Sequence, residues 1–242
     1  MSSSGYLKAP ITEAIIDIQF AEAMSQEICD KVKAKLIDQY PVVDDWVEGS
    51  FFVDVRKNAA QFQETVRGFR LSSLDQAWIA IIANSRFSTS RLAPYLGWEV
   101  FRDRAVNNWD VFKSVAGYLR IKRIGVRYIN RIDIPSEPDT PIHLSDYLNL
   151  YLQVPQPPFP PVNQQTAQAI FTFKNCTVVV NSATVPSPLL FHASIALDLD
   201  YGRDKDVPQN DDAMWAYIEK IRELKNLLFE ACVTDHAREL FQ

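Results

Sequence analysis

The chain is poor in glycine and cysteine and has no excess of positive charge. Its 242 residues include 7 glycines, 3 cysteines and 3 histidines, and the formal net charge is -5. So little glycine disfavours glycine-rich phosphate loops, and the missing basic field disfavours nucleic acid as a partner. Cys29, Cys176 and Cys232 are far apart and odd in number, so we expect reduced, mostly buried thiols rather than a disulfide framework.

Long hydrophobic runs are also missing. The longest apolar stretches, such as 78–83, are too short to span a bilayer. The opening residues show no basic segment followed by an apolar run, which a signal peptide would carry. We therefore expect a cytoplasmic protein with no membrane-spanning segment. With 47% hydrophobic residues, the chain can fold around a core of its own.

Hydrophobic periodicity predicts runs of neighbouring strands, each followed by a helix. Strands are expected over 11–20, 51–56, 67–74, 77–83, 85–92, 121–134, 166–173, 176–184 and 190–200. Helices are expected over 25–40, 98–119, 144–152 and 211–230. Neighbouring strands imply antiparallel pairing. We therefore predict an α+β fold, mainly antiparallel, with long helices packed on one face and an arrangement compatible with two similar halves.

A proline-rich segment divides the sequence. Five prolines within 153–163 favour an extended polyproline II connector, although such a segment could also dock into an aromatic groove. We expect an N-terminal α+β half at 1–152 and a C-terminal β-meander with a helix at 164–242, packed as one unit.

The strand predicted over 121–134 carries the most informative residues. Arg123, Arg127 and Arg131 fall on one face, because residues two apart on a strand share a face. This arginine row could hold phosphates or an acidic partner surface, since guanidinium groups bind both through paired hydrogen bonds. The alternative is cross-strand ion pairing, in which Glu13 and Asp17 of the first strand form ion pairs with two of these arginines.

A second basic group flanks the segment at 85–92 and the start of the following helix: Arg86, Arg91, Arg102 and Arg104. Together with Ser88 and Ser90 it could form an anion pocket. Glu99 and Asp103 stand near the last two arginines, so a solvated helix face is the competing interpretation.

Motifs for catalysis or metal binding are missing from the sequence. His143, His192 and His236 do not stand at metal-ligand spacing from a cysteine or from one another. Cys232 and His236 could form a nucleophilic pair four residues apart, but a buried structural cysteine is the simpler interpretation. The acidic loop at 198–212 lacks the EF-hand pattern. We therefore expect no cofactor and no metal, and lean toward a protein that is not an enzyme.

Three segments together are similar to an uncharacterised, sporadically distributed bacterial protein family of similar length. They are PITEAIIDIQF at 10–20, the block ending in IKRIGVRYINRIDIP at 121–135, and LLFEACVTDHARELF at 227–241. The most specific part is the Arg-Tyr-x-Asn-Arg strand, here Arg127, Tyr128, Asn130 and Arg131. The resemblance covers essentially the whole chain and implies no established activity. The patchy bacterial distribution is compatible with mobile or defence-associated genes.

We expect a non-enzymatic interaction or regulatory protein, such as a subunit of a bacterial defence or toxin-neutralising system. Its partner would be a protein, and self-association into a homo-oligomer is open. The alternative function is binding of a nucleotide or another anionic small molecule by the arginine-lined sheet face. The residues proposed to bind the ligand or partner are Arg123, Arg127, Tyr128, Asn130, Arg131, Arg86 and Arg91.

Overall fold

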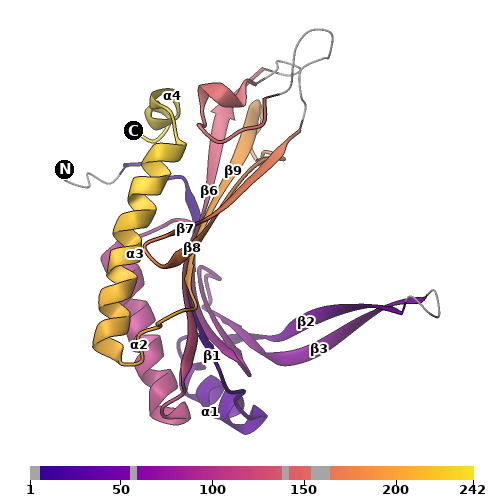
Figure 1. The fold of residues 1–242 in the computed structure, drawn as a ribbon, viewed down its shortest axis with the longest axis vertical. Coiled ribbons are helices and arrows are strands. Elements are labelled where there is room, and N and C mark those ends of the chain that lie inside the picture. Colours follow the sequence, from indigo (N-terminus) through magenta and orange to yellow (C-terminus); the bar gives the residue numbers. More distant parts are fainter. Residues whose placement is uncertain (1–5, 55–58, 138–141, 154–163) are drawn as a thin grey trace. The chain divides into compact units, whose positions relative to one another are not determined.

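The computed structural model describes residues 6–54, 59–137, 142–153 and 164–242, with the backbone alone for those of 48–64 (Figure 1). Within them the chain forms a nine-stranded antiparallel sheet in the order β2-β3-β4-β5-β1-β6-β9-β8-β7, contacted by helices. The α+β class predicted from the sequence is therefore confirmed. No helix of the described part is both long and apolar enough to cross a membrane.

The elements follow one another as strand groups closed by long helices. The strands are β1 (Ile11–Phe20), β2 (Val42–Asp54), β3 (Ala59–Ser72), β4 (Trp78–Ala83), β5 (Arg86–Leu92), β6 (Ile121–Pro135), β7 (Thr166–Phe173), β8 (Cys176–Val185) and β9 (His192–Arg203). The helices are α1 (Gln26–Leu36), α2 (Trp98–Ala116), α3 (Asp211–Cys232), α4 (Asp235–Glu239) and the 3₁₀ turn η1 (Leu144–Asp146).

The contacts group into two compact units. The α2 unit comprises 15–92 and 96–123, and the α3 unit comprises the described residues up to 14, 93–95 and those from 124 onward. Strands β1 and β6 contribute residues to both units, so this grouping does not follow the linear order of the chain. Residues 154–163 of the predicted proline-rich connector lie outside the described residues, and the boundary expected there stays a prediction.

The core of the α2 unit lies between helix α2 and the strands beneath it. The buried residues of α2 include Trp98, Phe101, Ala105, Trp109 and Phe112, as the spacing predicts. Two further predicted members of the stripe differ, because Ala116 is only partly buried and Leu119 lies beyond the end of the helix. The ring of Phe112 lies 5.2 Å from that of Phe20 on β1 and 4.6 Å from that of Phe87 on β5. The apolar side of the helix therefore packs against the inward-facing residues of the strands, and both apolar faces are buried.

The core of the α3 unit lies under helix α3. Asn210 caps this helix by accepting a hydrogen bond from the Ala213 N–H at 2.9 Å. Its buried face carries Met214, Ile218, Ile221 and Leu224, as predicted, while Phe229 rather than the predicted Leu228 is buried farther along. The facing residues of β9 are Ile195, Leu197, Leu199 and Tyr201.

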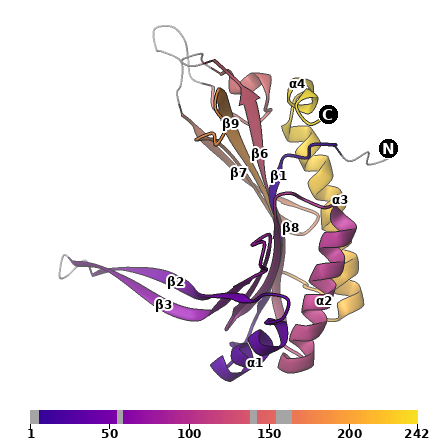
Figure 2. The same ribbon diagram turned by 180° about the vertical axis from the view of Figure 1, so that it is seen from behind.

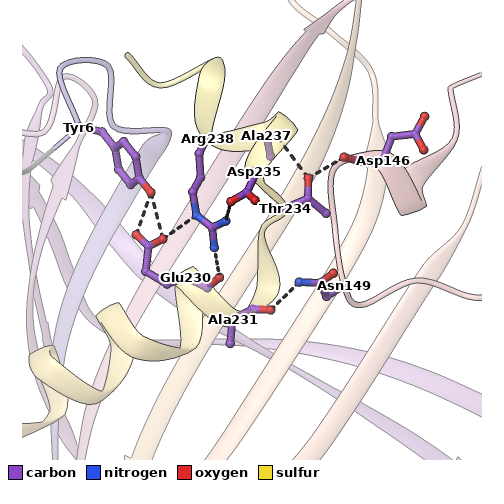
Figure 3. Close-up of polar contacts among 9 residues, drawn as sticks. All are labelled: Tyr6, Asp146, Asn149, Glu230, Ala231, Thr234, Asp235, Ala237 and Arg238. Carbon is purple, nitrogen blue, oxygen red and sulfur yellow. Dashed lines mark hydrogen bonds and ion pairs between the residues drawn. The ribbon is translucent and has the colours of Figure 1, made fainter.

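A polar cluster fastens the end of the chain in the α3 unit (Figure 3). The guanidinium of Arg238 donates to Glu230 (Nε to Oε2, 2.9 Å) and also binds Asp235. The Tyr6 hydroxyl donates to the same Glu230 carboxylate at 2.9 Å, and the Thr234 hydroxyl donates to the Asp146 carbonyl. These bonds fix α4 on the end of α3, which makes them structural.

Two predicted elements need correction. Strands β2 and β3 begin at Val42 and Ala59, eight or nine residues before the predicted 51 and 67, and pair from Val42↔Ser72 to Asp54↔Ala59. Backbone pairing does not require the apolar alternation that Asp44 and Asp45 interrupt. Figure 2 shows this hairpin extending away from the helices of its own unit.

The helix predicted over 144–152 is wrong beyond its first turn. Only Leu144–Asp146 is helical, as a 3₁₀ turn. Leu148 instead forms a β-bridge with Val233, and the Asn149 N–H donates to the Cys232 carbonyl at 2.8 Å. Hydrogen bonds to a distant segment therefore replace those that would have continued the helix.

Candidate functional site

The arginine row lies on the outward side of β6, as its spacing predicts. Even-numbered residues from Ile124 to Ile134 are buried, whereas the side chains of Arg123, Arg127 and Arg131 are 25%, 45% and 36% exposed. The row is therefore in contact with solvent, and its function depends on what its charges already bind.

Each arginine of the row has a carboxylate partner within the chain. Arg127 donates to both oxygens of Asp198, each at 2.7 Å, and Arg131 donates to Asp133 at 2.9 and 3.0 Å. Arg123 lies 3.4 Å from Asp17. The cross-strand alternative thus describes Arg123 and Arg127, with Asp17 as one of the two predicted acceptors, whereas Arg131 pairs with a residue of its own strand. Asp198 and Asp133 are acceptors that the sequence did not single out.

The partner of Arg127 belongs to a line of hydrogen bonds across the outer strands. Asp198 lies diagonally across β9, since Arg127 faces Asp200 directly. Asp198 also accepts from the Asn181 amide at 3.2 Å, and Asn181 accepts from Gln168 at 2.8 Å. The hydrogen bonds that Arg127 donates to Asp198 raise the pKa of Arg127. A guanidinium held in this way has little capacity left for an external dianion.

The partner of Arg131 is shared in the same manner. Burial raises the pKa of Asp133, but the hydrogen bonds from Arg131 and from the Ser194 hydroxyl outweigh burial and leave that pKa below its ordinary value. Asp133 is therefore held as a charged acceptor. In the Arg131–Asp133 pair, as in the Arg127–Asp198 pair, the charge of the arginine is therefore neutralised by a carboxylate of the chain.

Two other proposed site residues occupy the opposite face of β6. Tyr128 and Asn130 are 1% and 2% exposed. The Asn130 amide donates to the Leu197 carbonyl at 3.0 Å, and the Tyr128 hydroxyl lies 3.3 Å from that of Tyr95. Both side chains serve the core contacts of the α3 unit, so the structure does not bring them together with the arginine row.

The remaining two candidates, Arg86 and Arg91, point to different sides of β5. Arg86 forms an ion pair with Asp17 at 2.9 Å, and it shares this carboxylate with Arg123. Arg91 is buried, and its guanidinium lies 4.9 Å from the ring centroid of Trp78. The predicted anion pocket also includes Arg102, Arg104, Ser88 and Ser90, and the structure does not bring Arg86 and Arg91 together on one side of β5 for it.

A buried lysine that the sequence reading missed lies on α3. Lys225 is 8% exposed, and its Nζ lies 3.9 Å from the centroid of the Tyr128 ring. Burial, and secondly the charge of Arg222, lower its pKa from 10.5 to about 8. Its position, four residues after Ile221 on the apolar stripe, was a signal for burial.

A pocket of about 280 Å³ opens between the β7–β8 turn, β9 and α3. Lys174 and Asn175 of the turn, Arg203 of β9 and Lys220 of α3 line it with polar groups. Within the described part of the chain, none of its three cations has a carboxylate partner within ion-pair distance. These residues are far apart in sequence, which is why motif reading could not group them.

The inner wall of the pocket consists of a buried thiol, a phenol and two apolar side chains. The Tyr217 hydroxyl lies 2.9 Å from the Cys176 Sγ, and Ile221 and Leu224 complete the lining. Burial, followed by the contact with Cys176, raises the pKa of Tyr217 above its ordinary value. Tyr217 is therefore a neutral phenol at physiological pH.

Comparison with known proteins finds no matching family model and no matching curated protein. In the described ranges, no group of three or more His, Cys, Asp or Glu side chains is placed to hold a metal ion.

Proposed function

We propose that the protein is a non-enzymatic interaction protein that binds a partner polypeptide along β7, as a subunit or regulator of a bacterial defence or toxin-neutralising system. The observation that carries the proposal is the free edge of β7. This strand ends the sheet and pairs with β8 alone among the described strands.

The chemistry of β7 favours pairing with another chain. Its sequence, TAQAIFTF, contains no charge and no proline, and Ile170, Phe171 and Phe173 are 62%, 41% and 44% exposed. Edge strands are usually protected by charge, proline or bulges, because their free backbone groups bind other strands. An apolar edge without such protection is typical of sites that accept an added strand.

The turn that follows β7 indicates which backbone groups are free. Lys174 and Asn175 both have positive φ, 48° and 63°, as in a type I′ turn, and the flanking Phe173 and Cys176 pair. In such a hairpin the flanking pair exchanges hydrogen bonds and every second residue points its N–H outward. The N–H groups of Ile170 and Thr172 are thus available to a partner strand.

The cysteines support the cellular setting of the proposal. The three cysteines are free and buried, which fits a reducing, cytoplasmic compartment. The link to defence or toxin neutralisation rests on the sequence resemblance alone.

The test is co-expression of the tagged chain with the products of its neighbouring genes, followed by size-exclusion chromatography with light scattering. We expect a complex with one of these products. Ile170→Pro removes an outward N–H and should abolish the complex, whereas Ile170→Val keeps it and should leave the complex intact. A lone monomer in every co-expression would overturn the proposal, and a homodimer alone would replace the partner with a second copy.

The alternative function, anion binding on the arginine-lined sheet face, receives less support. Every arginine of the row already binds a carboxylate, so an external anion would have to compete with a partner held in place. A thermal-shift screen with nucleotides tests it, because only this alternative expects Arg127→Ala to remove a ligand-induced shift.

A further inference from the structure

We propose that the pocket between the β7–β8 turn, β9 and α3 binds the phosphate group of a small phosphorylated molecule. This inference is independent of the β7 edge, because other residues and other atoms carry it. It rests on three cations without carboxylate partners, on the fixed position of one of them, and on the apolar wall behind them.

The charge of the pocket is the exception in an acidic chain. The protein has a net charge of -5, yet Lys174, Arg203 and Lys220 converge from three separate elements on one pocket. Three like charges around one hollow repel one another, and an anion bound among them removes that repulsion. A phosphate dianion suits this set better than a carboxylate, because it offers more acceptor oxygens and twice the charge.

Arg203 is held in a fixed position at the pocket. Its Nε donates to the Lys205 carbonyl at 2.8 Å, and its guanidinium lies 4.9 Å from the ring centroid of Tyr217. A hydrogen bond also links the Arg203 and Tyr217 side chains. Tyr217 is itself held by Cys176. The guanidinium is therefore oriented in advance, which lowers the entropic cost of binding phosphate through paired hydrogen bonds.

The size and the wall of the pocket indicate that the phosphate belongs to a larger molecule. A volume of about 280 Å³ is close to the lower limit for small-molecule sites. Leu224 is 6% exposed and gives the pocket a small apolar surface that inorganic phosphate would not use, whereas Ile221 behind it is fully buried. The ligand class is thus a small phosphate monoester whose organic part contacts this wall.

The competing explanation is that these cations are solvated surface side chains that happen to be neighbours. Lys174 and Lys220 are exposed, as that explanation requires, but Arg203 is partly buried and anchored. The two explanations differ in one measurable respect. Solvated cations bind phosphate weakly and interchangeably, whereas a built site depends on the particular cations that line it.

Isothermal titration calorimetry of the full chain with inorganic phosphate and with AMP tests the proposal. Sodium chloride at equal ionic strength serves as the blank. We expect saturable binding, tighter for AMP if the organic part contacts the apolar wall. Arg203→Gln and Lys220→Gln should each weaken binding at least tenfold. Lys205→Gln removes the same charge two residues beyond Arg203, at a side chain that does not line the pocket, and should bind as the wild type does.

Binding that is absent for both probes, or that all three variants weaken equally, would overturn the proposal. If Arg203→Gln fails to fold, Lys174→Gln and Lys220→Gln still decide, since both side chains are exposed. Ile170→Pro should bind both probes normally, so failure of the pocket and failure of the proposed interaction at β7 remain distinguishable.

Discussion

The ammonium nitrogen of Lys225 on α3 lies 3.9 Å from the centroid of the Tyr128 ring on β6, with both side chains buried. Burial is the main reason why the pKa of Lys225 falls from 10.5 to about 8. The cation–π contact contributes about 1–2 kcal/mol, which offsets only part of the cost of desolvating the ammonium group. Holding this charge in the core therefore lowers the free energy of unfolding at neutral pH.

Replacing Lys225 with methionine should stabilise the protein by about 2 kcal/mol at pH 7. A pKa difference of about 2.5 (10.5 minus about 8) corresponds to about 3 kcal/mol, from which the lost cation–π contact is subtracted. Because the folded pKa lies below the unfolded one, the unfolded chain binds more protons between pH 8 and 10.5. The stability of the wild type relative to Lys225→Met should therefore rise with pH through this window.

Urea unfolding of both proteins between pH 7 and 10 measures this difference. Comparing wild type with variant at each pH cancels the contributions of the tyrosines and cysteines to the pH dependence, because these residues titrate in both proteins. Leu227→Met, at an exposed position on the same helix, replaces no titratable group, so it is the control and should show a difference that does not vary with pH. A gap between wild type and Lys225→Met that stays constant from pH 7 to 10 would contradict the assignment of Lys225 as a buried titrating group.

The ion pair between Arg127 and Asp198 should show measurable coupling in a double-mutant cycle. Asp198 is 14% exposed and accepts hydrogen bonds from both Arg127 and Asn181. We expect a coupling energy of about 1 kcal/mol between Arg127→Ala and Asp198→Ala, because the geometry is bidentate and one partner is largely buried. The pair Arg120–Glu22, with both side chains more than half exposed, is the control and should couple by less than about 0.5 kcal/mol. Equal coupling in the two cycles would show that the bidentate geometry adds nothing.

Asn108 should be a major stabilising residue of the α2 unit. Its side chain is fully buried, and its amide donates to the Tyr40 hydroxyl at 2.7 Å and to the Thr89 hydroxyl at 3.0 Å. Asn108→Ala leaves both hydroxyls without their donor and opens a cavity, so we expect a loss of about 2–3 kcal/mol and a fall in Tm of about 5–10 °C. Asn107→Ala, one residue earlier and exposed, should change Tm by less than about 2 °C. Scanning calorimetry of the two variants decides, and similar Tm values would refute the role given to Asn108.

Gly68 should tolerate no side chain. It faces Ala83 across the β3–β4 pair, and a Cβ built there would lie 1.9 Å from the Ile82 carbonyl oxygen. The neighbouring atoms are backbone and cannot move without breaking the pairing of the two strands, so Gly68→Ala should prevent folding of the α2 unit. Gly117→Ala is the matched control, because nothing lies within 4 Å of its Cβ and only its φ of 68° costs about 1 kcal/mol. Circular dichroism and near-UV spectra of the two variants compare them, and a native spectrum for Gly68→Ala would contradict the expected clash.

Local sequence patterns predicted much of the fold. The apolar stripe of α2, the inward residues of α3 and the alternation along β6 are properties of helical and strand periods, which neighbouring residues express by themselves. The β2–β3 hairpin and the segment after Leu144 escaped prediction, because backbone bonds to partners distant in sequence decide their conformation.

The sequence by itself determined that the chain is an antiparallel α+β protein and that Arg123, Arg127 and Arg131 point outward together. Only the tertiary structure decided what those cations bind, since Asp17 and Asp198 meet them through the pairing of strands far apart in the chain. The same holds for the pocket of Lys174, Arg203 and Lys220, and for the buried ammonium of Lys225. Side-chain direction follows from local backbone geometry, but the neighbour that a side chain meets depends on how distant elements pack.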